Sequence, residues 1–200
     1  MSAPDPIGLI LDALDDSARM KLAMREQAPG IHRIAVRIAE AFRAGHRLYA
    51  CGNGGSACDA MHLVEELVAR YKRDRPGLPA HHLIDAATLT CWSNDYEYAT
   101  AFQRQVETMI GPGDVLIALS TSGNSPNIVL AVEAANQRGA LTIGLTGKDG
   151  GRLLATCVES LVMPSDATER IQEGHITVIH LICELVERIL FGDLKPTEAS

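Results

Sequence analysis

Apolar positions in this chain follow two alternating periods. Apolar residues three and four apart predict helices at about 6–27, 31–44, 98–110, 126–138 and 171–190, a short helix at 151–156, and one that ends near residue 70. Short apolar runs at 47–51, 80–84, 114–119, 141–145 and 160–163 predict strands between them. Glycine and proline stand at most breaks, and Pro29-Gly30 predicts the boundary between the first two helices.

This alternation predicts an α/β fold, with a parallel sheet covered by helices on both faces. In such sheets, ligands bind at the carboxyl ends of the strands. The 200 residues, 46% of them hydrophobic, suit one compact unit. We expect an N-terminal helical segment at 1–45 that lies on the core, a main domain at 46–192, and a frayed tail at 193–200.

Two polar loops follow predicted strands. The loop Asn53-Gly54-Gly55-Ser56 precedes a helix, and the loop Ser120–Ser125 carries four hydroxyl groups in six residues before another. One hydroxyl would cap a helix, so the second loop has donors to spare, and we expect it to bind phosphate. The first loop is also explained by a tight turn alone. It lacks the P-loop lysine and the GxGxxG pattern, which argues against nucleotide cofactors.

Charge and cysteine content narrow the choice of partners. The net charge is −7 and no basic block occurs, which argues against nucleic acid and anionic membranes. Runs of about 18 uncharged apolar residues are missing, so we expect no membrane span. The N-terminus has no basic stretch that would start a signal peptide. Five cysteines without a paired spacing predict reduced thiols and a cytoplasmic location.

Titratable residues gather on two of the predicted helices. His62 lies three and four residues before Glu65 and Glu66, which could form either a site or a surface ion pair. The spacing does not decide which glutamate faces a site. On the last helix, Gln172 and His180 interrupt an apolar run, and a histidine there could equally be a core residue.

Five ordered motifs resemble a known family. They are CGNGGSACDAMH from Cys51, SNDY from Ser93, LSTSGNSPN from Leu119, LTGKDGG from Leu145 and RIQEGHITVIH from Arg170. Together, over about 30–192, they resemble the sedoheptulose 7-phosphate isomerases, or phosphoheptose isomerases, of the sugar isomerase (SIS) superfamily. The resemblance implies a three-layer sandwich around a five-stranded parallel sheet (the flavodoxin-like SIS fold), with N-terminal helices and a long C-terminal helix. It also implies a homotetramer with active sites between subunits, in which the N-terminal segment takes part.

The resemblance also implies an aldose–ketose isomerase. Its substrate would be sedoheptulose 7-phosphate, a phosphorylated seven-carbon sugar, and its product D-glycero-D-manno-heptose 7-phosphate, in the first step of heptose biosynthesis for lipopolysaccharide. Glu66 matches the catalytic base and His180 the acid. Zinc, where members bind it, would be held by His62, Glu66, Gln172 and His180; no nucleotide or redox cofactor is implied. Matches to substrate-binding residues are Asn53, Gly54, Gly55, Ser56, Glu66, Arg70, Asn94, Asp95, Ser120, Thr121, Ser122, Ser125 and Gln172.

Two residues depart from the family pattern. Ser93 stands where a glycine is usual before the Asn-Asp pair, and Glu169 stands where an aspartate is often found. Both departures leave the exact substrate less fixed than the reaction type.

Other functions compete with this interpretation. A non-catalytic SIS protein could bind a phosphosugar, or associate with a replication initiator, as a regulator; its acid and base residues should then be eroded. Other SIS enzymes, such as hexose-phosphate isomerases or N-acetylmuramic acid phosphate lyases, should differ in the closing helix. A third alternative is a purely structural α/β domain with no site. On that interpretation, both polar loops and the polar residues of both helices would occur together by coincidence.

Overall fold

A five-stranded parallel sheet forms the centre of the molecule. The structure is a computed structural model and describes residues 5–192. The strands are β1 (Leu48–Gly52), β2 (Ala80–His82), β3 (Val115–Ser120), β4 (Leu141–Gly147) and β5 (Glu159–Met163), in the order β2-β1-β3-β4-β5. All neighbouring pairs are parallel. The predicted α/β fold with five parallel strands is confirmed.

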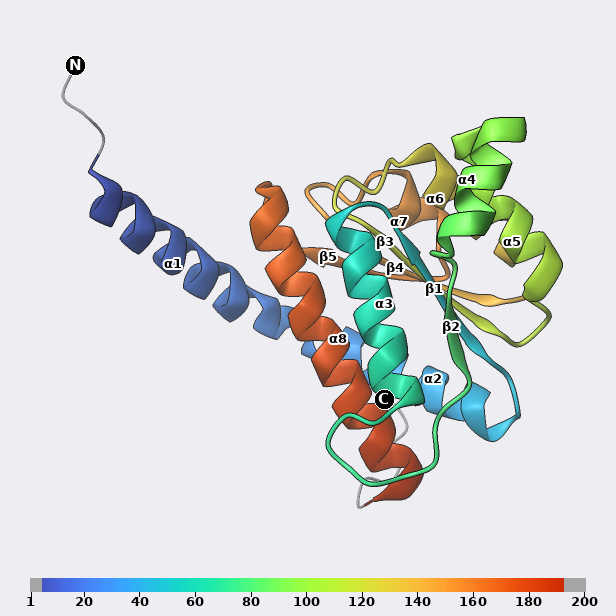
Figure 1. Cartoon of the computed structure of the whole chain (residues 1–200). Coiled ribbons are helices and arrows are strands. Elements are labelled where there is room, and N and C mark those ends of the chain that lie inside the picture. The colour runs from blue at the N-terminus through green and yellow to red at the C-terminus, as the bar shows by residue number, and fades with distance from the viewer. Residues whose placement is uncertain (1–4, 193–200) are drawn as a thin grey trace.

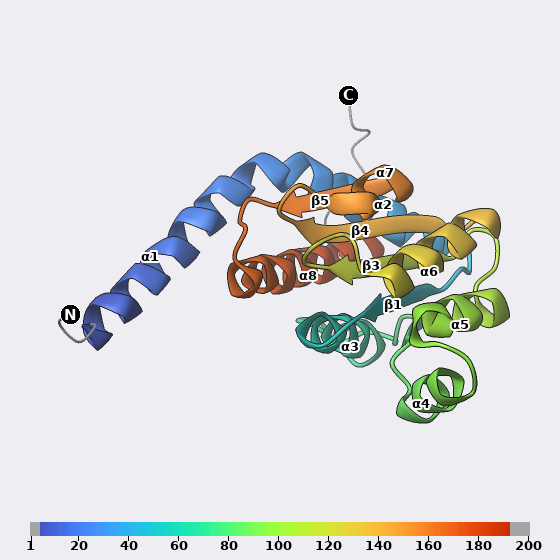
Figure 2. The ribbon, with the colours of Figure 1, turned by 90° about the horizontal axis from the view of Figure 1, so that it is seen from above.

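Helices cover both faces of the sheet, which gives three layers (Figures 1 and 2). On one face lie α2 (Ala28–Arg43), α3 (Gly55–Val68) and α8 (Thr168–Phe191). On the other lie α5 (Ala101–Met109), α6 (Pro126–Gln137) and α7 (Gly151–Thr156). The long C-terminal helix α8 lies beside α3, and both begin at the carboxyl edge of the sheet.

The sheet divides the apolar core in two. Along β3, Val115, Ile117 and Leu119 face the α2/α3/α8 layer, whereas Leu116 and Ala118 face the opposite layer. This is the two-residue alternation of a strand. All six residues of β3 are buried, which explains why the sequence reads as a continuous apolar run.

The N-terminal boundary differs from the prediction. Helix α1 (Pro6–Ala23) passes into a 3₁₀ turn, η1 (Met24–Gln27), and α2 begins at Ala28. Pro29 therefore lies in the first turn of α2 and does not break the helix. Proline is accepted there because the first N–H groups of a helix have no partner within the helix.

A helix absent from the sequence prediction follows β2. Helix α4 (Ala86–Asp95) is N-capped by Asp85, whose carboxylate accepts a bond from Thr88 N–H at 2.7 Å. The 3₁₀ turn η2 (Tyr98–Thr100) follows it. None of its residues is buried, so no amphipathic pattern marked it. The predicted frayed tail at 193–200 lies outside the described residues. Within residues 5–192, no helix combines the length and apolarity needed to cross a bilayer.

Candidate active site

Three strands end together and set two polar loops side by side. In the sheet register, Gly52 of β1 pairs with Leu119 of β3, and Ser120 of β3 pairs with Thr146 of β4. The loop after Gly52 and the loop after Ser120 therefore leave the same edge as neighbours. This is the edge at which open parallel sheets bind ligands.

The side chain of Asn53 joins the first loop to α6, the helix that follows the second loop. Its amide forms a reciprocal pair with the amide of Asn127 on α6, with both N···O distances at 2.9 Å. The hydroxyl of Tyr98 also donates to Asn53 Oδ1 at 2.5 Å. Asn127 is buried, and buried amides need such partners. The first loop is thus fixed against the start of α6 and against η2.

The hydroxyl loop curls around the N-terminus of α6. Ser125 occupies the N-cap position, but its side chain caps no N–H group; instead, its Oγ lies 3.1 Å from Ser120 Oγ. Thr121 and Ser122 are half-buried. The first N–H groups of α6 and these hydroxyls form a set of donors of the kind that binds phosphate. The second loop is therefore more than a helix cap.

Glycines allow this loop to touch the next one. Gly123 has a φ of +64°, and a Cβ placed on it would lie 1.9 Å from the carbonyl oxygen of Gly150. Asn124 spans the same gap, since its Oδ1 accepts a bond from Arg152 N–H at 3.0 Å. Only glycine combines the left-handed backbone with this close approach.

The glycine-rich loop lies against α8. Gly54 has a φ of +56° and precedes the first turn of α3, in which Ser56 is buried. A Cβ on Gly55 would lie 2.2 Å from Gln172 Nε2, so the Gln172 amide covers this glycine directly. The predicted residues Gly55 and Gln172 are therefore adjacent, although they are distant in sequence.

Further along the same two helices, three titratable side chains converge. His62 Nε2 lies 3.3 Å from Glu66 Oε1 and 3.1 Å from His180 Nε2. Glu66 is 16% exposed, whereas Glu65 points into solvent. The structure thus selects Glu66 from the two glutamates that the spacing left open. His180 is half-buried and is no core residue; the core histidine of α8 is His175.

This cluster has the dimensions of a metal site. The ligand atoms of His62, Glu66 and His180 all lie within 4.8 Å of one another. In a tetrahedral zinc site with Zn–N bonds of 2.0–2.1 Å, neighbouring ligand atoms lie about 3.3 Å apart. The two measured separations, 3.1 and 3.3 Å, are close to that value. Two imidazoles and a carboxylate fit zinc, and Gln172 remains a predicted fourth ligand.

Burial shifts the pKa of two side chains near the site. It raises the pKa of Asp59, three residues before His62, to about 6, against a smaller opposing effect of His62. Within the described residues, Asp59 Oδ2 is buried without a hydrogen-bond partner. Burial also lowers the pKa of His175 to about 4, although its bond to the Thr146 carbonyl acts in the opposite direction. His175 is therefore neutral at physiological pH.

Three exposed residues of the predicted site, Arg70, Asn94 and Asp95, lie apart from the titratable cluster. Asn94 and Asp95 end α4, and the Asn94 amide donates to the Asp95 carboxylate at 2.9 Å. Tyr98, a few residues on, ties this segment to Asn53. Arg70 lies just past the end of α3. In a single chain these three residues do not join the His62–Glu66–His180 cluster.

Three neighbours of the site were missed from the sequence. Asn127 follows Pro126 on the buried side of α6, and a polar residue among apolar ones there is a signal that helical periodicity could have found. Tyr98 and Tyr71 carry no such signal. The Tyr71 ring stacks on the His180 imidazole, with centroids 5.7 Å apart and planes 21° apart.

Comparison with known proteins agrees with this geometry. The SIS domain family model matches residues 15–147. The phosphoheptose isomerase of Trichlorobacter lovleyi is 51% identical over 80% of this chain and 82% of its own. A solved phosphoheptose isomerase from Francisella tularensis superposes with a TM-score of 0.89 at 31% identity, covering 92% of this chain and all of its own. One from Neisseria gonorrhoeae gives 0.85 at 34%, covering 92% and 99%.

Proposed function

This chain belongs to the phosphoheptose isomerase family of SIS-domain proteins and is an isomerase, and from that premise we propose that it converts sedoheptulose 7-phosphate into D-glycero-D-manno-heptose 7-phosphate. The observation that carries the proposal is the convergence of His62, Glu66 and His180 from two helices. A surface ion pair between His62 and a glutamate, the alternative interpretation, does not require a third side chain from another helix. The product would enter heptose biosynthesis for bacterial surface polysaccharide.

The reaction moves a proton between two neighbouring carbons of the sugar. A proton next to a carbonyl is weakly acidic, and a carboxylate within about 3 Å can remove it to give an enediol. We assign this step to Glu66, which takes the proton from C1 and returns one at C2. His180 exchanges protons with the two sugar oxygens. Both side chains are partly buried.

The hydroxyl loop would hold the far end of the substrate. Ser120, Thr121, Ser122 and Ser125 offer hydroxyl donors beside the uncapped start of α6. Because the chain carries a net charge of −7, these local donors must offset an unfavourable overall field. Phosphate binding at this loop would orient the carbonyl end of the sugar toward Glu66. Asn53, Gly54, Gly55, Ser56, Asn94, Asp95 and Arg70 would line the sugar between them.

Zinc fits the donor set of the site. We assign His62, Glu66 and His180 as ligands, with the Gln172 amide oxygen as the fourth. When bound, zinc would polarise the substrate carbonyl and stabilise negative charge on its oxygen. A metal-bound carboxylate is a weaker base, so Glu66 would shift its coordination before it takes the proton from C1. Removing the metal with a chelator should abolish turnover, and added Zn²⁺ should restore it.

A homotetramer would complete the molecule. Helix α1 extends away from the body (Figures 1 and 2), and Ile7, Leu9, Ile10, Leu11 and Leu14 are each more than half exposed. Exposed apolar side chains in such number mark a surface that associates. We propose that the 1–45 segment packs against other subunits, which would bring exposed residues such as Arg70 to neighbouring sites. Light scattering should then give four times 21.5 kDa.

All five cysteines are free thiols, which fits a cytoplasmic location.

The decisive experiment is direct. The pure protein is incubated with sedoheptulose 7-phosphate, and the aldoheptose is followed by NMR with and without chelator. Formation of the aldoheptose supports the proposal. Binding of the sugar phosphate without turnover, in the presence of Zn²⁺, would instead indicate a phosphosugar-binding regulator. Turnover of a hexose phosphate in place of the heptose would indicate another SIS isomerase.

A further inference from the structure

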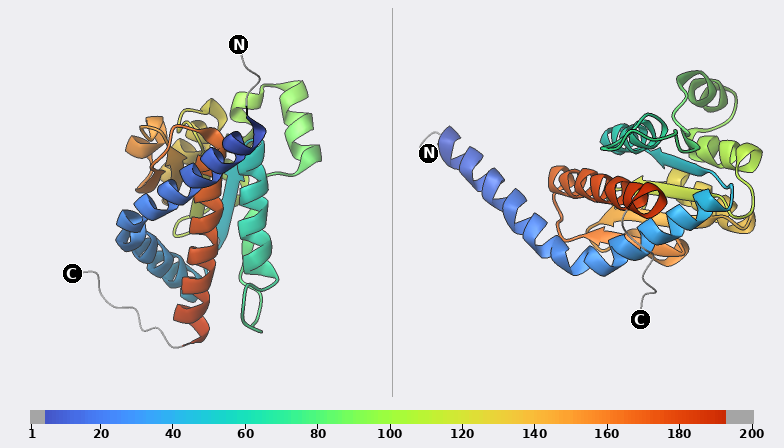
Figure 3. Two further views of the ribbon diagram at one scale, coloured as in Figure 1. Left: turned by 90° about the vertical axis from the view of Figure 1, so that its left-hand side faces the viewer. Right: turned by 90° about the horizontal axis from the view of Figure 1, so that it is seen from below.

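A buried ion pair joins α8 to the segment that follows the end of α3 at Val68. Figure 3 shows the backbone of this segment beside the C-terminal part of α8. Arg75 Nε lies 2.8 Å from Glu187 Oε1, and the two side chains are only 1% and 2% exposed. The Glu187 carboxylate also accepts backbone N–H groups from residues 71, 72 and 73, at 3.0, 3.1 and 3.1 Å. A carboxylate with four donors is fully satisfied, so Glu187 holds the 71–75 segment firmly against α8.

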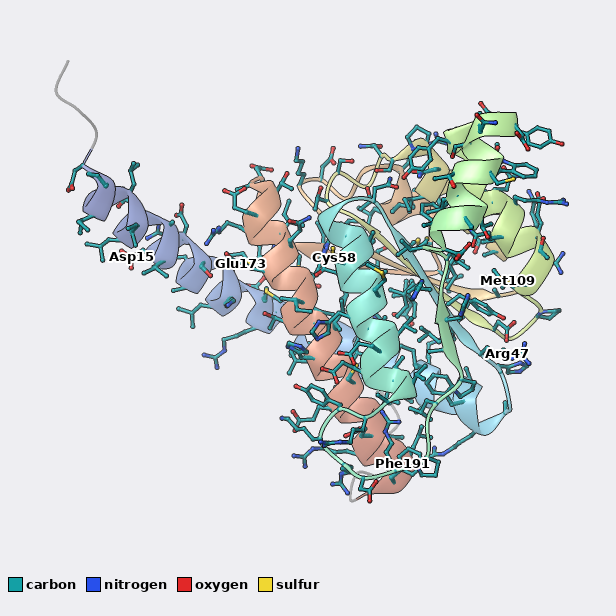
Figure 4. The ribbon with its side chains drawn as sticks, viewed as in Figure 1. Asp15, Arg47, Cys58, Met109, Glu173 and Phe191 are labelled. Carbon is teal, nitrogen blue, oxygen red and sulfur yellow. The ribbon has the colours of Figure 1, made fainter. Side chains whose placement is uncertain are left out.

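Arg75 also binds α3, and we call the buried Arg75–Glu187 pair with its backbone contacts the clamp. Its guanidinium donates to the carbonyl oxygens of Glu66 and Leu67, both at 2.8 Å. These carbonyls belong to the last turn of α3, which has no partners further along the helix. The Phe191 ring, labelled in Figure 4 at the end of α8, lies 6.0 Å from the same guanidinium. One cation therefore fixes the backbone of Glu66 relative to α8.

Tyr71 links the clamp to His180. Its backbone N–H is one of those held by Glu187, and its ring stacks on the imidazole of His180. The imidazole also contacts His62 at 3.1 Å. With a planar ring on one side and His62 at its nitrogen, His180 has little freedom to turn.

We propose that Arg75, Glu187 and Tyr71 are positioning residues, which set the placement of Glu66 and His180 relative to each other. Arg75 and Glu187 would act on the backbone of α3, and Tyr71 would act on the orientation of the His180 ring. The inference rests on the proposed roles of Glu66 and His180. A shift of about 1 Å between reacting groups can cost on the order of a hundredfold in rate, so such a clamp has a measurable effect.

The test separates the ring from the clamp. Tyr71→Phe keeps the stacking ring, whereas Tyr71→Leu removes it and leaves Arg75 and Glu187 in place. We expect Tyr71→Phe to match the wild type. Tyr71→Leu should lower kcat about tenfold with KM within about twofold. Its melting temperature should fall only slightly, because the Tyr71 ring is only partly buried against the core. The ring protons of His180, assigned with a His180→Gln variant, should move downfield in Tyr71→Leu only, because the stacked ring no longer shields them.

Glu187→Gln tests the clamp itself. It should lower both kcat and the melting temperature, because Arg75 is left buried without its charge partner. The matched control is Glu159→Gln. Glu159 lies on the distant strand β5, and its largely buried carboxylate binds Arg33 and Arg37 of α2. That control should lose stability and keep kcat.

The outcomes distinguish this inference from the proposed function. Wild-type kcat in Tyr71→Leu, or equal losses in Tyr71→Leu and Tyr71→Phe, would overturn the role of the stacked ring. Wild-type kcat in folded Glu187→Gln would overturn the role of the clamp. Full activity of His180→Gln would instead reject the proposed function on which both rest.

Discussion

Acid should destabilise this protein through one buried histidine. His175 is fully buried on α8, and its Nε2 lies 3.1 Å from the carbonyl oxygen of Thr146. A carbonyl only accepts, so Nε2 carries the proton and donates. The other ring nitrogen, Nδ1, is buried without a partner among the described residues. A second proton would therefore place an unpaired charge in the core.

The size of the effect follows from the pKa. Burial lowers the pKa of His175 from 6.5 to about 4 in the folded chain. The unfolded chain takes up a proton below pH 6.5, whereas the folded chain does so only near pH 4. This contribution to stability is present in full above pH 6.5 and is lost as the pH falls toward 4. The whole loss is about 3 kcal/mol, of which about 2 kcal/mol appear by pH 5.

Urea unfolding followed by circular dichroism measures this loss. Wild type and His175→Gln are compared at pH 7.5 and pH 5 at one protein concentration. The variant is less stable at pH 7.5, but its stability should fall less on acidification, by about 2 kcal/mol. Val178→Ala, also buried on α8, is the control, because it should lower stability equally at both pH values. The same pH dependence in His175→Gln and wild type would refute the reasoning.

Three substitutions test the loops. Ser122→Ala should chiefly raise KM for the sugar phosphate, with kcat nearly unchanged; steady-state kinetics with unchanged KM at each of the four hydroxyl positions would reject the phosphate assignment. Gly55→Ala should displace the flexible Gln172 amide, so the variant should lose activity while its melting temperature changes little. A fully active variant would show that the position of Gln172 does not matter for the reaction. Gly123→Ala should destabilise the protein by at least about 2 kcal/mol in urea, because a positive φ and the Gly150 carbonyl both oppose a Cβ. Wild-type stability there would contradict the described loop.

The sheet was predictable because its signal is local. Buried parallel strands read as apolar runs, and β3, β4 and their flanking glycines follow that pattern. Helix α4 escaped prediction because none of its residues is buried, so it has no apolar stripe. The first helix boundary was misplaced because proline and glycine are acceptable in the opening turn of α2.

The site was predictable in its members but not in its geometry. Spacing put His62 near two glutamates, and the family resemblance favoured Glu66. The fold adds that Glu66 lies in one cluster with His62 and His180, whereas Glu65 is exposed. The contact of Gln172 with Gly55 depends on the parallel packing of α3 and α8, which no local pattern encodes. The same holds for Tyr71, whose ring reaches His180 through a loop with no periodicity.

The central claim is that Glu66 moves the proton, and a pair of neighbouring variants tests it directly. Glu66→Gln and the exposed control Glu65→Gln are assayed with sedoheptulose 7-phosphate in the presence of Zn²⁺, and sugar phosphate binding is measured by calorimetry. Glu66→Gln should lose about 10²- to 10⁴-fold in kcat while still binding the sugar phosphate, and Glu65→Gln should match the wild type. Wild-type turnover by Glu66→Gln would contradict the account.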